Sequence, residues 1–228
     1  MATWRKPMTA IGRFAAGALL LLLPIVMPAL PLTAANGQVP AGKWAVLTFD
    51  PAETSLSFSL TGWPHDTHGT FKLKRGLIRV DPASGKMDGS IIADAASGSS
   101  GVSLRDARMR SSILDTARFP DIAFAPRQVI SHGNPPGEFP VKVRGIMTLH
   151  GVQHEFAIDA QIHRDANRVR IESDFVIPYV EWGLENPSIL MFTVSKNVDL
   201  HVTSVAHLSW VDAPASALHA GSPAAIAR

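Results

Sequence analysis

The chain has 228 residues, of which 46% are hydrophobic and 18% are charged, a balance that is typical of a globular protein with a hydrophobic core. It contains no cysteine, which excludes disulfides, thiolate metal sites and cysteine nucleophiles. The formal net charge is +2, but three basic residues and no acid lie in residues 1–35, so the rest carries −1 (+2 less 3). A near-neutral domain lacks the basic surface that nucleic-acid binding requires.

Residues 1–35 have the order of a secretory signal peptide: basic residues first, then the apolar run Phe14–Met27, then small residues ending at Ala35. A membrane-spanning helix needs about 20 apolar residues. Pro24 interrupts this run, and Pro28 and Pro31 follow it closely, which favours a cleaved signal over an uncleaved anchor. We therefore expect a periplasmic or secreted protein with no stable membrane span after cleavage.

Three further segments follow. Residues 36–43 have the composition of a linker, residues 44–211 that of one β-rich domain, and residues 212–228, rich in Ala, Ser and Pro, that of a disordered tail. Strands are expected where apolar residues are consecutive or alternate with polar ones, at 45–49, 55–60, 69–80, 86–94, 122–130, 141–150, 152–163, 168–174 and 189–208. About eight strands at hairpin-like spacing favour an antiparallel barrel or sandwich.

One amphipathic helix is expected between the fourth and fifth of these stretches. It would begin at Ser103, where Asp106 has the spacing of a capping box, and end before Pro120. Its apolar stripe consists of Leu104, Met109, Ile113 and Leu114, and its basic residues are Arg105, Arg108 and Arg110. A single short helix in a β-rich chain is expected to close one end of the barrel or sandwich.

Large apolar residues fall on one face of the expected strands, and several are phenylalanines: Phe58, Phe71, Phe124, Phe156, Phe175 and Phe192. A barrel of about eight strands either fills with side chains or holds one small ligand. The alternation alone leaves both a ligand cavity and a solid core open.

Motifs for catalysis or metal binding are weak. His150 and His154 are four residues apart, but Gly151 makes the segment a hairpin turn, so the helical spacing argument for a metal site fails. His65 and His68 have no evident third ligand. There is no GxSxG motif and no phosphate-binding glycine loop. We therefore expect no metal, no cofactor and no enzymatic activity.

Several motifs together resemble the YceI-type family of bacterial polyisoprenoid-binding proteins. They are DPAETSLSF at Asp50–Phe58, GTF at Gly69–Phe71, LRDARMRSSILDTARFPDIAF at Leu104–Phe124, GIMTLHGVQHEF at Gly145–Phe156 and an apolar strand at Val198–Val202. The resemblance covers about residues 44–208. It implies a mainly β protein, an eight-stranded antiparallel lipocalin-like barrel with one short covering helix.

The resemblance also implies a function, namely a periplasmic binding or carrier protein for a polyisoprenoid or quinone-like lipid held in the barrel, without catalysis. The inward sets and the helix would then line the lumen, through Leu56, Phe58, Leu60, Phe71, Leu73, Met109, Ile113, Leu114, Phe124, Phe156, Ile158, Phe175, Ile177, Trp182 and Phe192. Arg105 and Arg108, three residues apart on the helix, are the candidates for an anionic head group, whereas Arg110 points elsewhere.

Two other functions stay open at this point. One is a solid-cored β domain that serves as a protein-interaction or stress-response module, and the other is a lipid-modifying enzyme. The expected partner is a long-chain lipid and not nucleic acid, and the sequence also leaves a homodimer open.

The first prediction concerns export. Expressed in a Gram-negative host, the protein should appear in the periplasm with its amino terminus near Ala35 or Asn36, because residues 1–35 have the order of a cleaved signal. Intact-mass measurement of the periplasmic protein checks this. A membrane-bound product that retains residues 1–35 would contradict it.

Overall fold

The structure, a computed structural model, describes residues 42–130, 137–189 and 191–213. The expected signal peptide at 1–35, most of the expected linker and the tail beyond residue 213 lie outside the described residues. Among the helices that are described, none has the length and apolar character needed to cross a membrane.

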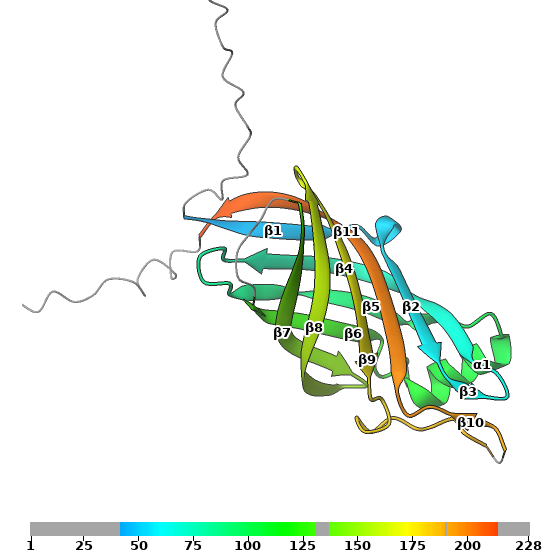
Figure 1. Ribbon diagram of the computed structural model, residues 1–228. Coiled ribbons are helices and arrows are strands. Elements are labelled where there is room, and N and C mark those ends of the chain that lie inside the picture. The colour runs from blue at the N-terminus through cyan, green and yellow to red at the C-terminus, as the bar shows by residue number, and fades with distance from the viewer. Residues whose placement is uncertain (1–41, 131–136, 190, 214–228) are drawn as a thin grey trace, which may run out of the picture. The chain divides into compact units, whose positions relative to one another are not determined.

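The domain is a closed antiparallel β-barrel (Figure 1). Its strands are β1 (Lys43–Phe49), β2 (Ser55–Leu60), β4 (Thr67–Val80), β5 (Met87–Ser99), β6 (Asp121–Ile130), β7 (Glu138–Leu149), β8 (Val152–Asp165), β9 (Arg168–Ile177) and β11 (Val198–Asp212). Their order is β1-β11-β2-β4-β5-β6-β7-β8-β9, and the pairing of β9 with β11 closes the sheet. β1 and β2 share one position, so nine strands fill eight positions. The expectation of a mainly β, eight-stranded antiparallel barrel with one short helix is confirmed.

The shared position arises from a break at Asp50. The side chain of Asp50 accepts a hydrogen bond from the Ala52 N–H at 2.8 Å and caps the short 3-10 helix η1 (Pro51–Glu53). Before the break β1 pairs with the second half of β4, and after it β2 pairs with the first half. Both strands therefore lie between β4 and β11.

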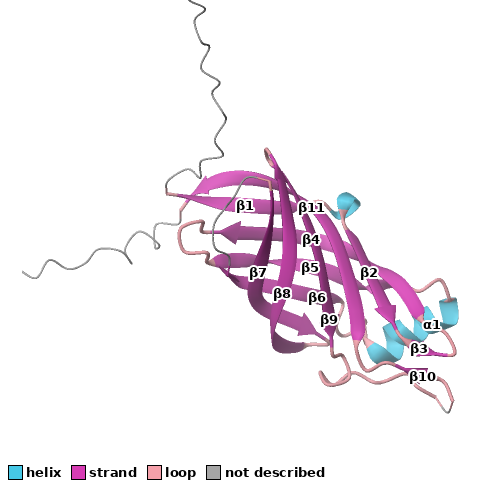
Figure 2. Cartoon of the chain, in the orientation of Figure 1, coloured by secondary structure: helices cyan, strands magenta, loops and turns pink. Residues whose placement is uncertain are grey.

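The helix is shorter than the sequence suggested. α1 (Ser103–Arg108) continues into one π-helical turn, η2 (Met109–Ile113), and the helical segment ends there instead of at Pro120 (Figure 2). Asp115 follows in the left-handed region, with φ of 43°, and accepts hydrogen bonds from the backbone N–H groups of Arg118 and Phe119. The chain therefore turns away from the helix five residues before the proline.

The expected capping box is also wrong. The N-cap residue is Val102, and no side chain caps the helix. The carboxylate of Asp106 instead reaches back to the end of β5, where it accepts hydrogen bonds from the Ser100 N–H at 2.7 Å and from the Ser99 hydroxyl at 3.3 Å. Asp106 is only 7% exposed, and the pKa of its carboxyl group is lowered, first by a hydrogen bond from the Ser100 hydroxyl at 2.5 Å and then by those from the Ser100 N–H and the Ser99 hydroxyl. The contact ties α1 to β5.

A small ribbon stands beside the helix at the same end of the barrel. It pairs β3 (Gly62–Trp63) with β10 (Thr193–Val194). The stretch at 189–208 was expected to be one continuous strand, and this is wrong. β10 is only two residues long, and Ser195–Asn197 bends the chain before β11 begins.

The second prediction concerns Asp106. Asp106→Ala should lower the melting temperature at neutral pH, and the deficit should shrink as the pH falls below about 3.9, the ordinary pKa of Asp. The folded-state pKa is lowered, so the stabilisation is present above the unfolded-state pKa and is lost as the pH falls through the folded-state value.

Thermal unfolding followed by circular dichroism at several pH values checks this. Asp88→Ala, which removes an exposed ion pair with Arg79, is the control and should change the melting temperature little. Equal melting temperatures of Asp106→Ala and the unsubstituted protein at neutral pH would contradict the prediction.

Candidate ligand-binding cavity

The barrel is hollow. A cavity of about 1360 Å³ lies inside it, and every barrel strand contributes inward side chains to the lining. Most of these side chains are aliphatic or aromatic. Pockets for drug-sized ligands typically measure about 300–1,000 Å³, so this cavity can hold a larger apolar molecule.

The cavity stays open because several aromatic rings lie against glycines of neighbouring strands. A Cβ atom built on Gly69 of β4 would lie 2.4 Å from the ring of Phe58, the residue paired with it on β2. One built on Gly76 would lie 2.9 Å from Phe49, which pairs with it on β1. These rings occupy the space of absent side chains, so they rest on the wall instead of crossing the lumen.

Thirteen of the fifteen expected lining residues border the cavity: Leu56, Phe58, Leu60, Phe71, Leu73, Met109, Ile113, Leu114, Phe124, Ile158, Phe175, Ile177 and Phe192. They come from five barrel strands (β2, β4, β6, β8 and β9), the helical segment and the ribbon end. Their contact with a ligand stays a prediction. The sequence reasoning did not single out other lining residues such as Ile91, Val143 and Leu200, although they share the same alternation.

The other two expected lining residues, Phe156 and Trp182, do not border the cavity directly and pack against the buried cluster that contains Met147 and Ile177. Trp182 lies in the loop after β9 and stacks on His154, with ring centroids 4.1 Å apart and an interplanar angle of 3°. Phe156 meets Trp182 and Phe175 edge-on, each at 5.6 Å. Alternation correctly gave Phe156 a half-buried position, but nothing local in the sequence showed that the loop would pack on it.

Charged side chains line the cavity only near its two ends. Arg105 and Arg108 lie at the helix end, and Asp81 and Arg164 lie near the β4–β5 and β8–β9 turns at the other end. Between them the lining offers no carboxylate or imidazole among the described residues. Such an interior suits an apolar ligand.

Tyr179 is the buried titratable group of the lining. It is 5% exposed, its hydroxyl donates a hydrogen bond to the Ser195 carbonyl at 2.7 Å, and burial raises the pKa of its phenol. This bond fixes the loop after β9 to the segment before β11. The tyrosine therefore has a structural partner and stays neutral at physiological pH.

The two head-group candidates differ in their partners. Arg105 donates to neutral oxygens, from Nε to the Ser100 hydroxyl at 2.7 Å and from Nη1 to the Thr67 hydroxyl at 3.2 Å. Arg108 forms an ion pair with Glu185 at 3.2 Å. Within the described ranges, Arg105 has no carboxylate within 4.0 Å of its guanidinium nitrogens, so its charge at the mouth is not neutralised by a direct ion pair.

Arg110 lies off the cavity. It is half-buried, and its Nη1 donates to the Gly98 carbonyl at 3.3 Å. The expectation that it points away from Arg105 and Arg108 agrees with this contact. Its hydrogen bond therefore goes to the backbone of β5.

Two of the described histidines pack against aromatic rings. His154 stacks on Trp182, and His150 packs against Phe119 with ring centroids 4.5 Å apart. Of the described residues, only Asp50, Glu53 and His207 form a group close enough to share a metal ion, on the outside of the barrel. Glu53 is already paired with Arg168, and Asp50 caps η1. Both carboxylates of this group therefore already have partners in the protein. The expectation of no metal site stays a prediction.

Comparisons with known proteins agree with this geometry. A family model described as the YceI-like domain matches residues 47–206. BcnA of Burkholderia cenocepacia is structurally similar, with a TM-score of 0.57 and 14% sequence identity, over 69% of this chain and 98% of that one. A polyisoprenoid binding domain from Saccharophagus degradans, implicated in plant cell wall breakdown, gives a TM-score of 0.54 and 17% identity, over 72% of this chain and 98% of that one.

At these identities the two structures establish the fold alone. Among proteins with curated descriptions, none matches the chain.

Proposed function

Because the chain belongs to the YceI-like domain family, we propose that it binds a long-chain apolar lipid, a polyisoprenoid or a quinone with an isoprenoid tail, inside the barrel. The observation that carries the proposal is the cavity of about 1360 Å³, with an apolar interior and charges only near its ends. The name of the Saccharophagus degradans domain, which describes polyisoprenoid binding, supports it.

The energetics of such binding need no specific hydrogen bond. Each methylene group transferred from water to an apolar site contributes about 0.8 kcal/mol. A tail of about 20 buried carbons would therefore supply about 16 kcal/mol before the cost of ordering it is subtracted. That gross term is large enough to retain a lipid in a lumen lined by Leu, Ile, Val and Phe.

The competing functions fit the geometry less well. A solid-cored interaction module would not need a lumen of this volume. A lipid-modifying enzyme would need reactive groups next to the buried chain, and the described lining has its charged groups near the two ends. We therefore favour a binding or carrier protein, which would act in the periplasm if residues 1–35 are cleaved.

The third prediction tests lipid retention. Ala160 of β8 borders the cavity and is 8% exposed, whereas Ala157 of the same strand is exposed on the outer face. Ala160→Trp should lower the amount of co-purified lipid by filling the lumen, and Ala157→Trp should leave it unchanged. Native mass spectrometry and solvent extraction of the exported protein measure both.

Circular dichroism confirms that each variant folds. If the unsubstituted protein carries no lipid and takes up no added polyprenyl lipid, the proposed function is wrong.

The fourth prediction concerns the head group. Arg105 can turn to an anionic ligand by giving up hydrogen bonds to neutral groups, whereas Arg108 must leave Glu185. Arg105→Ala should therefore weaken binding of a polyprenyl phosphate about tenfold or more, since a hydrogen bond to a charged group contributes about 1.5–3 kcal/mol. Arg108→Ala should have the smaller effect.

A neutral quinone with a comparable tail is the matched ligand, and Arg110→Ala is the matched variant on the same helix. Arg105→Ala should change the dissociation constant of the quinone little, and Arg110→Ala should change that of the polyprenyl phosphate little. Equal losses for the phosphate and the quinone would mean that Arg105 holds the helix in place and does not recognise the head group.

A further inference from the structure

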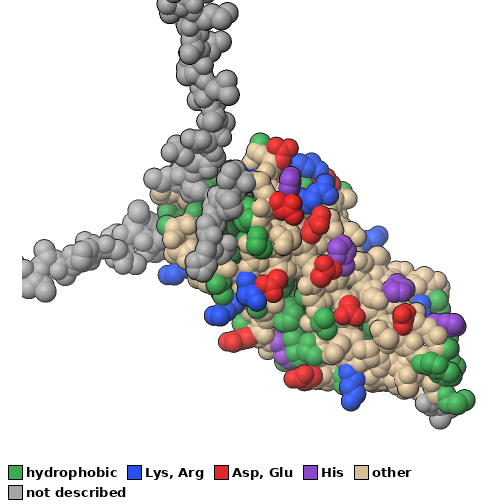
Figure 3. Space-filling view, in the orientation of Figure 1, with side chains coloured by type: hydrophobic (Ala, Val, Ile, Leu, Met, Phe, Trp, Pro, Cys, Tyr) green, Lys and Arg blue, Asp and Glu red, His purple; other side chains and the backbone are tan. Residues whose placement is uncertain are grey.

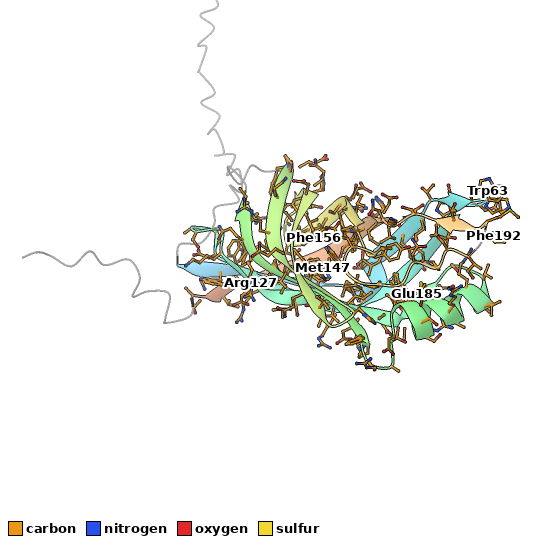
Figure 4. All side chains as sticks on the ribbon, turned by 90° about the horizontal axis from the view of Figure 1, so that it is seen from below. Trp63, Arg127, Met147, Phe156, Glu185 and Phe192 are labelled. Atoms are coloured by element: carbon orange, nitrogen blue, oxygen red, sulfur yellow. The ribbon has the colours of Figure 1, made fainter. Side chains whose placement is uncertain are left out.

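The most exposed large apolar side chains gather at the helix end of the barrel. Among the described residues the four highest exposures are 83% for Leu104, 76% for Met191, 61% for Trp63 and 60% for Phe192. Figure 4 shows Trp63 and Phe192 at one end of the molecule, the end that also carries Glu185 and the helix. Val102 and Ile189, about half exposed, belong to the same end. We call these six residues the apolar rim.

The backbone around the rim is held by hydrogen bonds. Ile189 and Phe192 exchange backbone hydrogen bonds at 3.0 and 2.9 Å, and Trp63 pairs with Thr193. The side chain of Asp66 accepts a hydrogen bond from the Gly62 N–H at 3.0 Å. These bonds fix the backbone that carries Trp63 and Phe192, which are 61% and 60% exposed.

The rim is continuous with the cavity. Trp63, Val102, Leu104 and Phe192 border the cavity as well as solvent. Apolar side chains are also visible at this end of the surface (Figure 3). Soluble proteins seldom expose contiguous apolar surface of this kind without a binding role. A partner that covers the rim also faces the mouth of the cavity.

The charges beside the rim indicate the kind of partner. Arg105 and Arg108 border the same mouth, and Arg105 has no direct ion pair within the described part of the chain. Exposed tryptophan and aliphatic residues beside arginine are the composition of surfaces that bind the membrane interface, where the rings enter the head-group layer and the cations contact phosphates.

We propose that the apolar rim docks on the surface of a phospholipid bilayer, with the mouth of the cavity facing the membrane. An apolar chain can then move between the bilayer and the lumen without crossing water. This lipid exchange rests on the proposed function, whereas docking requires only the rim and its arginines.

Sedimentation with vesicles tests the docking. The exported protein should bind vesicles of phosphatidylcholine and bind more strongly when phosphatidylglycerol is included, because Arg105, which donates only to neutral groups, can contact anionic head groups. Trp63→Ser combined with Phe192→Ser should weaken binding at least tenfold. Leu77→Ser combined with Val211→Ser, which removes comparably apolar residues outside the rim, should leave binding unchanged.

Fluorescence quenching by brominated phospholipid locates the contact. The unsubstituted protein should be quenched when it binds, and Trp63→Phe should retain binding but lose much of the quenching. Absence of vesicle binding by the folded protein would overturn the proposal, as would equal binding by the Trp63 and Phe192 double variant.

A second copy of the chain is the competing occupant of the rim. Sedimentation velocity tests this alternative. If the unsubstituted protein is a dimer, the double variant is a monomer and neither binds vesicles, then a second copy of the chain covers the rim and the bilayer does not. Native mass spectrometry of the same samples separates the two proposals. Bound lipid without docking overturns only the docking, and docking without bound lipid overturns only the proposed function.

Discussion

The lumen depends on the close approach of phenylalanine rings to glycine backbones in the barrel wall. Phe58 occupies the side-chain space of Gly69, and Phe49 that of Gly76, on strands that pair directly. Gly145 of β7 gives the same room to the ring of Phe124. A side chain at any of these glycines would have to displace the ring or the strand. The barrel therefore buries large aromatic residues, which stabilise the wall, and still keeps its centre open.

A second set of contacts fixes the mouth. Ser100 joins two of the three charged residues of α1, because its hydroxyl accepts from Arg105 and its backbone N–H donates to Asp106. Arg105 also reaches Thr67 at the start of β4. The backbone and hydroxyl of Ser100 thus hold α1 against the end of β5 and orient Arg105 at the mouth. Through Arg105 the end of β5 is also connected to the start of β4. Anchoring of this kind compensates for a helix too short to be stable on its own.

Much of the barrel could be predicted from alternation, because one face of each strand is apolar over most of its length. Alternation correctly gave the inward positions of Phe58 and Phe71, and the glycine itself marked the turn at Gly151. The failures involve contacts distant in sequence. The partners of Asp106 belong to the preceding strand, and the rings that meet Phe156 come from a loop and from β9. The early end of the helix is set by a left-handed residue, Asp115, that no breaker motif marked.

The break at Asp50 has a mechanical consequence for the wall. β4 pairs with β2 through Phe71 and with β1 from Gly76 onward, so residues 72–75 fall outside both ladders. Across the break the wall is joined by the Asp50 N–H to the Val205 carbonyl at 2.9 Å, and by the hydroxyls of Thr54 and Ser204, 2.8 Å apart. The break therefore interrupts the backbone pairing on one side of β4, while β11 continues past it as an uninterrupted strand. Because local opening is favoured where backbone pairing is interrupted, we expect the wall to open more easily at residues 72–75 than within the β1–β4 and β2–β4 ladders on either side.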